Sequence, residues 1–379
     1  MNSIEALLRR KARERLAPRL VGGLYRGLLG READPDGLAV HGARFASGAV
    51  GIAQLAADLA GSDEFKSRHG EPAPQEPDAR SHEPLGCSRS EAEAVFAPFR
   101  AEGLEGEPGF VTNFMGGRLS VSFVAGIEAL SGAVEGLPIP GNCHGETLEW
   151  VGTLRAVQEA RGSFAVVELG AGWAPWCAIA HRGARMRGVE DVRVVAVEGE
   201  AGHVGFIHEH LRDNGVPAEA ARVLHGVAGP RDGFAEFPRH RRASNDYGGA
   251  AAFGEAPGER AGLDHFVELR PDNLAEIERL PCYSLATLLE PFDRADLVHC
   301  DVQGAEHEVF SAGMAAAGAK ARRVVVGTHS FALDRSLIGL FAGAGWVCEG
   351  VNACEMLERE TGSPVTVRDG CQVWRNPRL

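Results

Sequence analysis

The sequence predicts an α/β protein, a doubly wound sheet with helices on both faces, joined to a small N-terminal helical domain. Three observations predict it. The apolar run Phe164–Val167 ends in Glu168 and is followed by the glycine turn Gly170–Gly172. Apolar runs of similar length recur beyond residue 190 and alternate with helix-like segments, as in parallel sheets buried on both faces. The first 70 residues carry only helical periodicity.

Residues 1–70 are expected to form a helical interaction module. Apolar side chains recur at helical spacing over Leu20–Leu29, and Asp34–Gly37 is a turn or helix-start signal. Residues 71–90 are rich in proline and charge, so we expect a linker there, between the helical module and the domain 91–379.

The larger domain should begin with an extension or lid over 91–160, and 229–282 should be an insertion on the substrate side, because it lacks clear elements. Helices are expected at 92–99, 146–160, 176–187, 203–211, 304–314 and 337–341, and strands at 119–123, 164–167, 192–197, 223–227, 297–301, 323–327, 346–349 and 371–374.

Composition excludes several classes of protein. A formal net charge of -13 and a pI near 5.6 argue against binding to nucleic acid. The eight cysteines never form a Cys-x-x-Cys pair, so neither a zinc site nor a disulfide framework is expected, and a reducing cytoplasm fits them best. No apolar run approaches the length of a transmembrane helix.

The turn after Glu168 predicts a cofactor site, since only glycine lets a ligand approach the backbone so closely. A dinucleotide would use free N–H groups at the next helix, where Pro175 has none. Glu168 would repel a pyrophosphate but attract the cationic methionine end of S-adenosylmethionine. The pattern therefore favours S-adenosylmethionine, with a dinucleotide as the alternative.

Acidic residues also follow two later strands. Glu198 ends the strand after the glycine turn, where a carboxylate can accept hydrogen bonds from both ribose hydroxyls of an adenosine cofactor. Asp301 ends a strand further on. The predicted cofactor-binding residues are Glu168, Gly170, Gly172, Trp173, Glu198 and Asp301.

Three residues are candidates for catalysis, because ligands lie across the carboxyl ends of parallel strands. Methyl transfer to a hydroxyl needs alignment and a base. Asp301 and His329 are the candidate bases, and Glu306 could orient either of them or bind a divalent metal with Asp301. His299, inside the same strand as Asp301, is expected to be packed.

Substrate contacts are expected in two segments. Asn245, Asp246 and Tyr247 lie in the insertion 229–282. His144 lies just before the helix that leads into the first core strand, a position from which loops often cover a cofactor pocket.

Three strings resemble the FkbM-type S-adenosylmethionine-dependent methyltransferases: Glu168–Gly172, Val197–Glu198 with Leu211–Gly215, and Cys300–Glu306. The match spans about residues 145–376. It implies a seven-stranded Rossmann-like sheet with the last strand antiparallel, and O-methylation of a sugar, polyketide or similar natural product. By position, Glu168, Gly170 and Gly172 would line the methionine side and Glu198 the ribose.

The chain departs from that family at two positions. Gln303 stands where the family commonly has Glu, and Ala174 where it commonly has Gly.

The string Leu24–Leu38, with Gly61–Phe65, resembles a bacterial helical module of unknown function found beside glycosyltransferases. This resemblance covers about residues 15–70 and implies protein contacts rather than chemistry.

We therefore expect a cytoplasmic O-methyltransferase that uses S-adenosylmethionine, releases S-adenosylhomocysteine and acts on a small-molecule or glycan hydroxyl. Two alternatives stay open, an NAD-dependent oxidoreductase and a non-catalytic module that binds partners through the same scaffold. The sequence leaves the metal, the acceptor and the oligomeric state open.

Overall fold

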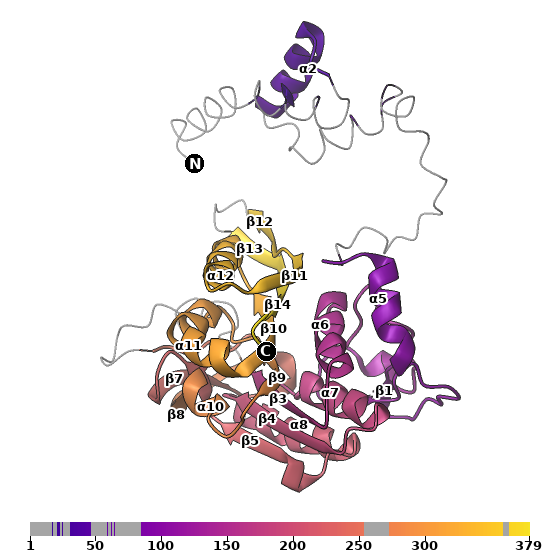
Figure 1. Ribbon diagram of the computed structural model, residues 1–379, viewed down its shortest axis with the longest axis vertical. Coiled ribbons are helices and arrows are strands. Elements are labelled where there is room, and N and C mark those ends of the chain that lie inside the picture. Colours follow the sequence, from indigo (N-terminus) through magenta and orange to yellow (C-terminus); the bar gives the residue numbers. More distant parts are fainter. Residues whose placement is uncertain are drawn as a thin grey trace. The chain divides into compact units, whose positions relative to one another are not determined.

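We describe the protein from a computed structural model (Figure 1). It describes residues 85–253, 273–358 and 364–379, together with 31–46 and the single residues 17, 21, 22, 25, 59, 62 and 64; the side chains of 46, 356–358 and 364–367 are excepted. The chain forms two compact units, Met1–Ser81 and His82–Leu379.

In the first unit, helix α2 (Pro35–Ala46) begins where the sequence predicts. Asp34 Oδ1 accepts from Gly37 N at 2.7 Å, and this bond, with a hydrogen bond from Arg31, lowers the pKa of Asp34. Arg31 also donates through two nitrogens to Glu64, each at 2.6 Å. This pair links the two strings that carry the resemblance. The other helices predicted for residues 1–70 lie outside the described residues.

A seven-stranded sheet forms the centre of the second unit. Five neighbouring strands run parallel, and the last strand of the chain runs antiparallel to both of its neighbours, as predicted. The order across the sheet is β11 (Val347–Asn352), β14 (Gly370–Arg375), β10 (Ala321–Thr328), β9 (Ala295–Cys300), β3 (Ser163–Leu169), β4 (Asp191–Glu198) and β5 (Ala221–His225).

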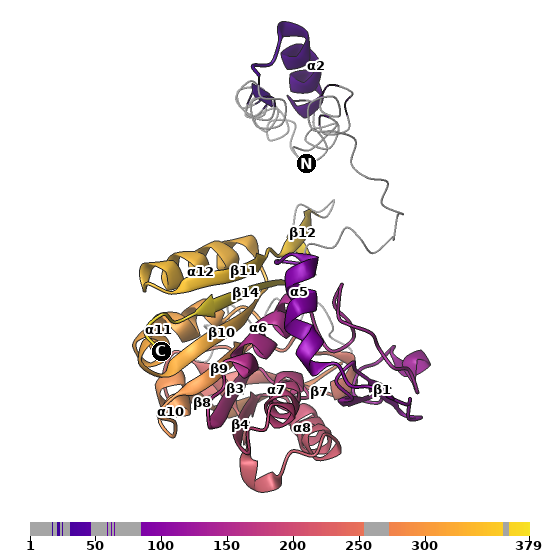
Figure 2. The same cartoon turned by 45° about the vertical axis from the view of Figure 1, so that its right-hand side comes forward.

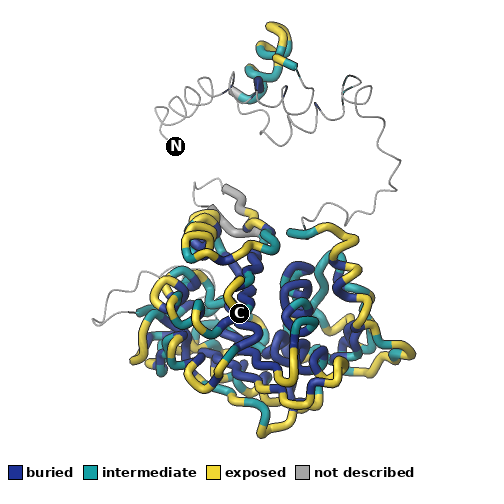
Figure 3. The backbone as a smooth tube through the Cα atoms, viewed as in Figure 1, coloured by how far each residue is buried: buried dark blue, intermediate teal, exposed yellow. Residues whose placement is uncertain are grey.

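Helices cover both faces of this sheet because its central strands are apolar on both sides. In β3, Val166 packs in the core on one face and Val167 in the core on the other. Figures 1 and 2 show the two layers, and Figure 3 shows the strands buried between them. One layer holds α5 (Arg89–Phe96), α6 (Thr147–Gln158), α7 (Pro175–Met186) and α8 (Ala201–Asp213), and the other holds α10 (Leu285–Leu289), α11 (Glu306–Lys320) and α12 (Phe331–Gly343).

The segment 229–282 differs from the prediction. Its described residues include β7 (Gly233–His240) and most of β8 (Leu274–Ser284), which pair over their length and form a second sheet with β6 (Val227–Gly229). Pro238 and Pro281 lie within the two long strands, where proline argues against a strand in the sequence, and the exposed faces of these strands carry charges, so the sequence signal is weak. The strand predicted over 223–227 is accordingly two strands, since β5 ends before Val227.

Smaller elements complete the unit. They are β1 (Phe110–Thr112) paired with β2 (Arg118–Ser120), β12 (Glu355–Glu358) paired with β13 (Pro364–Arg368), and the 3-10 turns Ala97–Phe99, Glu128–Leu130, Ala218–Ala220 and Ala243–Asn245. Among the described residues, none of the helices has the length and apolar character needed to cross a bilayer.

Candidate active site

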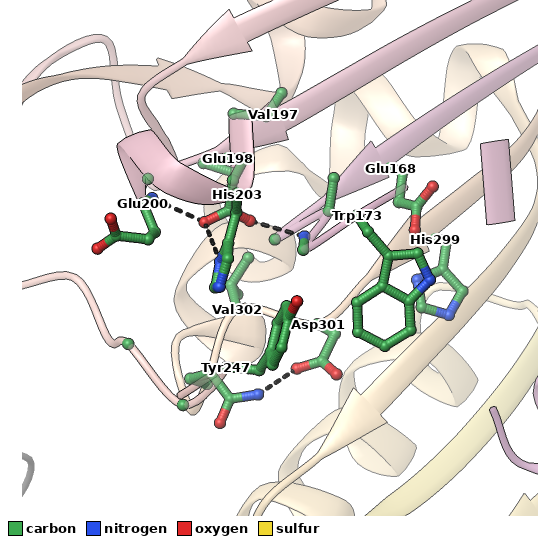
Figure 4. Close-up of a pocket in the computed structure, with 18 of the residues that line it drawn as sticks. Glu168, Trp173, Val197, Glu198, Glu200, His203, Tyr247, His299, Asp301 and Val302 are labelled. Atoms are coloured by element: carbon green, nitrogen blue, oxygen red, sulfur yellow. Dashed lines mark hydrogen bonds and ion pairs between the residues drawn. The ribbon is translucent and has the colours of Figure 1, made fainter. Parts of the chain in front are cut away.

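A cavity of about 440 Å³ lies at the carboxyl ends of β3, β4 and β9 (Figure 4). Glu168, Glu198 and Asp301 all line it, so the three strand-end acids converge as the sequence predicts. A cavity of this size falls within the range of small-molecule and cofactor sites.

The turn after β3 needs glycine at position 170 because the backbone of the loop after β9 lies close to it. Gly170 has φ +70°, and a Cβ built on it would lie 1.7 Å from the carbonyl oxygen of Asp301. Any side chain at position 170 would therefore push the β9 loop away. Ala174, at φ +58°, also adopts the left-handed conformation, which explains why glycine is common there in the family that the sequence resembles.

Glu168 is buried and holds the start of helix α7. Its Oε1 accepts from Trp176 N at 3.3 Å and its Oε2 from Cys177 N at 2.7 Å. Burial raises the pKa of Glu168 to about 7, against the opposing charge of His299. The carboxylate therefore occupies the helix N-terminus, where a dinucleotide phosphate would bind. Direct contact of Glu168 with a cofactor stays a prediction, and a carboxylate has capacity for further donors.

The raised pKa of Glu168 predicts a pH-dependent stability. The folded chain keeps a proton on Glu168 between the ordinary pKa of 4.5 and about 7, whereas the unfolded chain releases it. As pH rises through this window, the free energy of unfolding should fall by about 3 kcal/mol from this group alone. Glu168→Gln has no titrating group at this position. Urea unfolding at pH 4.5 to 8 should therefore show the free energy of unfolding of the variant rising relative to that of the wild type as the pH increases. Parallel curves for the two proteins would contradict the assignment.

Glu198 ties the tip of β4 to the glycine turn. Its Oε2 accepts from Gly172 N and its Oε1 from Glu200 N, both at 2.7 Å, with His203 Nδ1 at 3.5 Å (Figure 4). Burial alone would lower the pKa of His203, but Glu198 raises it above the ordinary value. Glu198 is thus held in a fixed orientation at the cavity wall.

An aromatic group covers the turn. The ring of Tyr247 stacks on His203 with centroids 4.1 Å apart and meets Trp173 edge-on at 4.9 Å, and its hydroxyl donates to Phe123 O at 2.6 Å. Of the three substrate residues predicted in the insertion, only Tyr247 lines the cavity. Asn245 and Asp246 precede it in the loop, outside the described lining.

Asp301, His329 and Glu306 form one cluster. His329 Nε2 lies 3.2 Å from Asp301 Oδ1, and its Nδ1 lies 3.2 Å from Glu306 Oε1. Burial opposes charge on His329, but Asp301 and then Glu306 raise its pKa well above the ordinary value. Burial would likewise raise the pKa of Asp301, yet the charge of His329 holds it below its usual range. His329 is therefore an imidazolium between two carboxylates.

The cluster has further polar contacts. Gln303, at φ +56°, donates from Nε2 to Asp301 Oδ1 at 2.7 Å, which a glutamate at this position could not do at neutral pH. Glu306 accepts from Val302 N and Gly304 N. Candidate ligand atoms of Asp301, Glu306 and His329 lie within 4.8 Å of one another, as do those of Glu135, Cys143 and His144.

Several residues of the cavity wall were not predicted. His299 is buried but lines the cavity, stacked on Trp176 with centroids 5.0 Å apart, and its Nε2 lies 3.0 Å from Glu149 Oε1. Asp369, just before β14, also lines it. His144 also lines the cavity, its contact with a substrate stays a prediction, and its Nδ1 lies 3.0 Å from Glu135 Oε2.

The cavity wall is acidic. It holds histidines but neither lysine nor arginine among the described residues, and its carboxylates are Glu149, Glu168, Glu198, Glu200, Asp301 and Asp369. Such a wall favours a cationic or neutral ligand over a polyanion.

The strand order, the glycine turn and the acids at the strand tips define a Rossmann-like protein of the methyltransferase type. The chain is 30% identical over 288 residues, 74% of its length and 97% of the other protein's, to a protein of Jannaschia sp. (strain CCS1) named "Putative methyltransferase". It belongs to this methyltransferase family. No protein-family model matches the chain.

Two solved structures show a distant similarity. The precorrin-6Y C5,15-methyltransferase of Geobacter metallireducens GS-15 is 13% identical, with a TM-score of 0.31 over 61% of this chain and 87% of that one. The C-terminal domain of the Rhodobacter capsulatus enzyme is 11% identical, with a TM-score of 0.32 over 61% and 89%. The fold is defined by the strand order of the seven-stranded sheet.

Proposed function

We propose that the protein is an S-adenosylmethionine-dependent O-methyltransferase of the FkbM type, whose acceptor is a hydroxyl of a sugar, glycan or natural product. The charge of the cavity carries this proposal. Six acidic side chains, of which Glu168 has its pKa raised to about 7 by burial, stand without lysine or arginine among the described lining residues, and they suit a sulfonium and oppose a pyrophosphate. The start of α7 supports the same choice, because Pro175 has no N–H and the next two N–H groups donate to Glu168.

The cofactor residues have distinct roles in this proposal. Glu198 accepts hydrogen bonds from the ribose hydroxyls, because its oxygens lie at the cavity wall beside Gly172. Phe237 approaches Gly199, the residue after Glu198, so the second sheet borders the adenosine end. The acceptor then enters beside the proposed base Asp301, near Asp369 of the cavity wall.

S-adenosylmethionine, when bound, supplies a methyl group on a sulfonium that departs as a neutral thioether. Asp301 accepts a hydrogen bond from the acceptor hydroxyl and takes its proton as the carbon–oxygen bond forms, since the methylated oxygen is far more acidic than an aspartic acid. His329 carries a charge already and is a poor base. We therefore assign His329 and Glu306 to positioning Asp301 and keeping it ionised.

A metal-assisted reaction is the second candidate, and the closeness of Asp301, Glu306 and His329 favours it. The two mechanisms differ in one outcome. Turnover that survives exhaustive treatment with a chelator supports the Asp301–His329 arrangement, and turnover restored only by a divalent cation supports the metal.

The N-terminal module is proposed to mediate protein contacts. Its described core contains Val21, Tyr25 and Leu59, and none of its described residues lines the cavity at the strand ends. We assign it no part in the chemistry.

Cofactor binding tests the proposal directly. Isothermal titration should give binding of S-adenosylhomocysteine to the wild type and none of NADH. Glu198→Gln should weaken S-adenosylhomocysteine by about 10- to 100-fold, because one acceptor of a charged, partly buried hydrogen-bond set is lost. Glu236→Gln, at a carboxylate of β7 outside the described cavity wall, is the matched control and should leave affinity unchanged. Tight NADH binding without S-adenosylhomocysteine binding would refute the function.

A further inference from the structure

Four buried side-chain nitrogens of residues in the cavity wall lack hydrogen-bond partners. They are Nδ1 of His299, Nε1 of Trp173, Nε2 of His144 and Nδ1 of His240, and the last of these lies 3.4 Å from Glu200 Oε2. The His299 side chain is only 2% exposed, so water does not compensate it. Buried polar groups are nearly always hydrogen-bonded, and leaving one unpaired costs about 1 to 3 kcal/mol. Such atoms gathered in one cavity indicate a ligand that pairs with them.

Glu149 determines which ring nitrogen of His299 faces the ligand. Its Oε1 lies 3.0 Å from His299 Nε2, which can donate to it, so Nδ1 is the ring nitrogen left to pair with a ligand. The stack on Trp176 fixes the plane of the ring. Glu149 is itself held, because its Oε2 accepts from Glu146 N at 2.8 Å at the start of α6.

The position of His299 identifies the part of the ligand that it meets. It pairs in register with Glu168 on the neighbouring strand, and Asp301 directly follows the end of β9. Figure 4 shows His299 and Trp173 on the side of the cavity away from Glu198. If Glu198 holds the ribose, these residues meet the opposite end of the cofactor.

Resting on the proposed function, we propose that His299 Nδ1 and Trp173 Nε1 bind the amino-acid end of S-adenosylmethionine, with Glu149 as the positioning residue for His299. That end is a zwitterion. Its ammonium needs acceptors, which His299 and the neighbouring carboxylates provide. Its carboxylate needs donors, and the Trp173 N–H is an unpaired one in a described wall without lysine or arginine.

The test compares two ligands on the full-length protein by isothermal titration. S-adenosylhomocysteine and 5′-methylthioadenosine share the adenosine and the thioether, but only the first has the amino-acid end. His299→Phe keeps a ring on Trp176 and should weaken S-adenosylhomocysteine 10- to 100-fold while changing 5′-methylthioadenosine less than twofold. Trp173→Phe should weaken only S-adenosylhomocysteine, about 5- to 10-fold.

Further variants separate positioning and folding effects from direct binding. Glu149→Ala should weaken S-adenosylhomocysteine selectively, and Glu149→Gln, which keeps an acceptor oxygen for His299, should restore most of the affinity. His181→Phe removes a buried histidine of α7 outside the described cavity wall and should change neither ligand.

The outcomes are distinguishable. Equal weakening of both ligands by His299→Phe, or unchanged S-adenosylhomocysteine affinity, overturns the inference while the cofactor assignment stands. A wild type that binds neither ligand overturns the proposed function, and this inference with it.

Discussion

Asp301→Asn is expected to lower kcat by about 100-fold or more, while the Kd for S-adenosylhomocysteine stays within about threefold. General-base catalysis typically contributes a factor of this size, and an amide cannot take the proton. The size of the side chain is kept, and Oδ1 can still accept from Gln303. The rate of transfer of a labelled methyl group to extracts of the producing cell reports the change in turnover. Isothermal titration with S-adenosylhomocysteine gives the Kd.

His329→Gln distinguishes the role of the base, Asp301, from that of His329, which positions it. Removing the imidazolium should let the pKa of Asp301 rise, because its charge holds that pKa below the usual range. Asp301 would then protonate at a higher pH, so the acidic limb of kcat against pH should move upward, with activity partly recovered at high pH. Full activity in Asp301→Asn would exclude Asp301 as the base.

The central sheet could be predicted because buried parallel strands are continuous apolar runs. β3, β4 and β9 each read this way, and an acid at the end of each run placed Glu168, Glu198 and Asp301 at one edge. Strand ends converge whatever the loops do, so these positions follow from topology alone.

Other wall residues have no local signal. Glu149 lies within a predicted amphipathic helix and reads as a solvent-facing charge, although it contacts His299, which is 150 residues away. Asp369 precedes a glycine and reads as a turn. The sequence predicted that Glu168 lies at the cofactor site but not that it holds the start of α7. Its distance to the N–H groups of Trp176 and Cys177 depends on the conformation of the intervening turn. The roles of Glu149, Asp369 and Glu168 all depend on contacts made in the folded chain, which the local sequence does not indicate.

Gly170→Ala should be among the most damaging single substitutions in the chain. Its φ of +70° costs an alanine about 1 kcal/mol, and its Cβ would lie 1.7 Å from Asp301 O, a distance at which no structure can exist unchanged. The neighbouring loop must move, so we expect a loss of more than about 4 kcal/mol in the free energy of unfolding, as seen where backbone is displaced. Urea unfolding measures it.

Gly162→Ala is the matched control, since Gly162 has φ +73° but nothing within 4 Å of an added Cβ. It carries the conformational penalty alone and should lose about 1 kcal/mol. The difference between the two variants isolates the close approach of the β3 turn to the β9 loop. Equal losses would mean that the two loops are not in contact. A much larger loss at Gly170 would mean that the cofactor turn and Asp301 are set by one backbone contact, so that the methyl donor and the base are aligned by the fold itself.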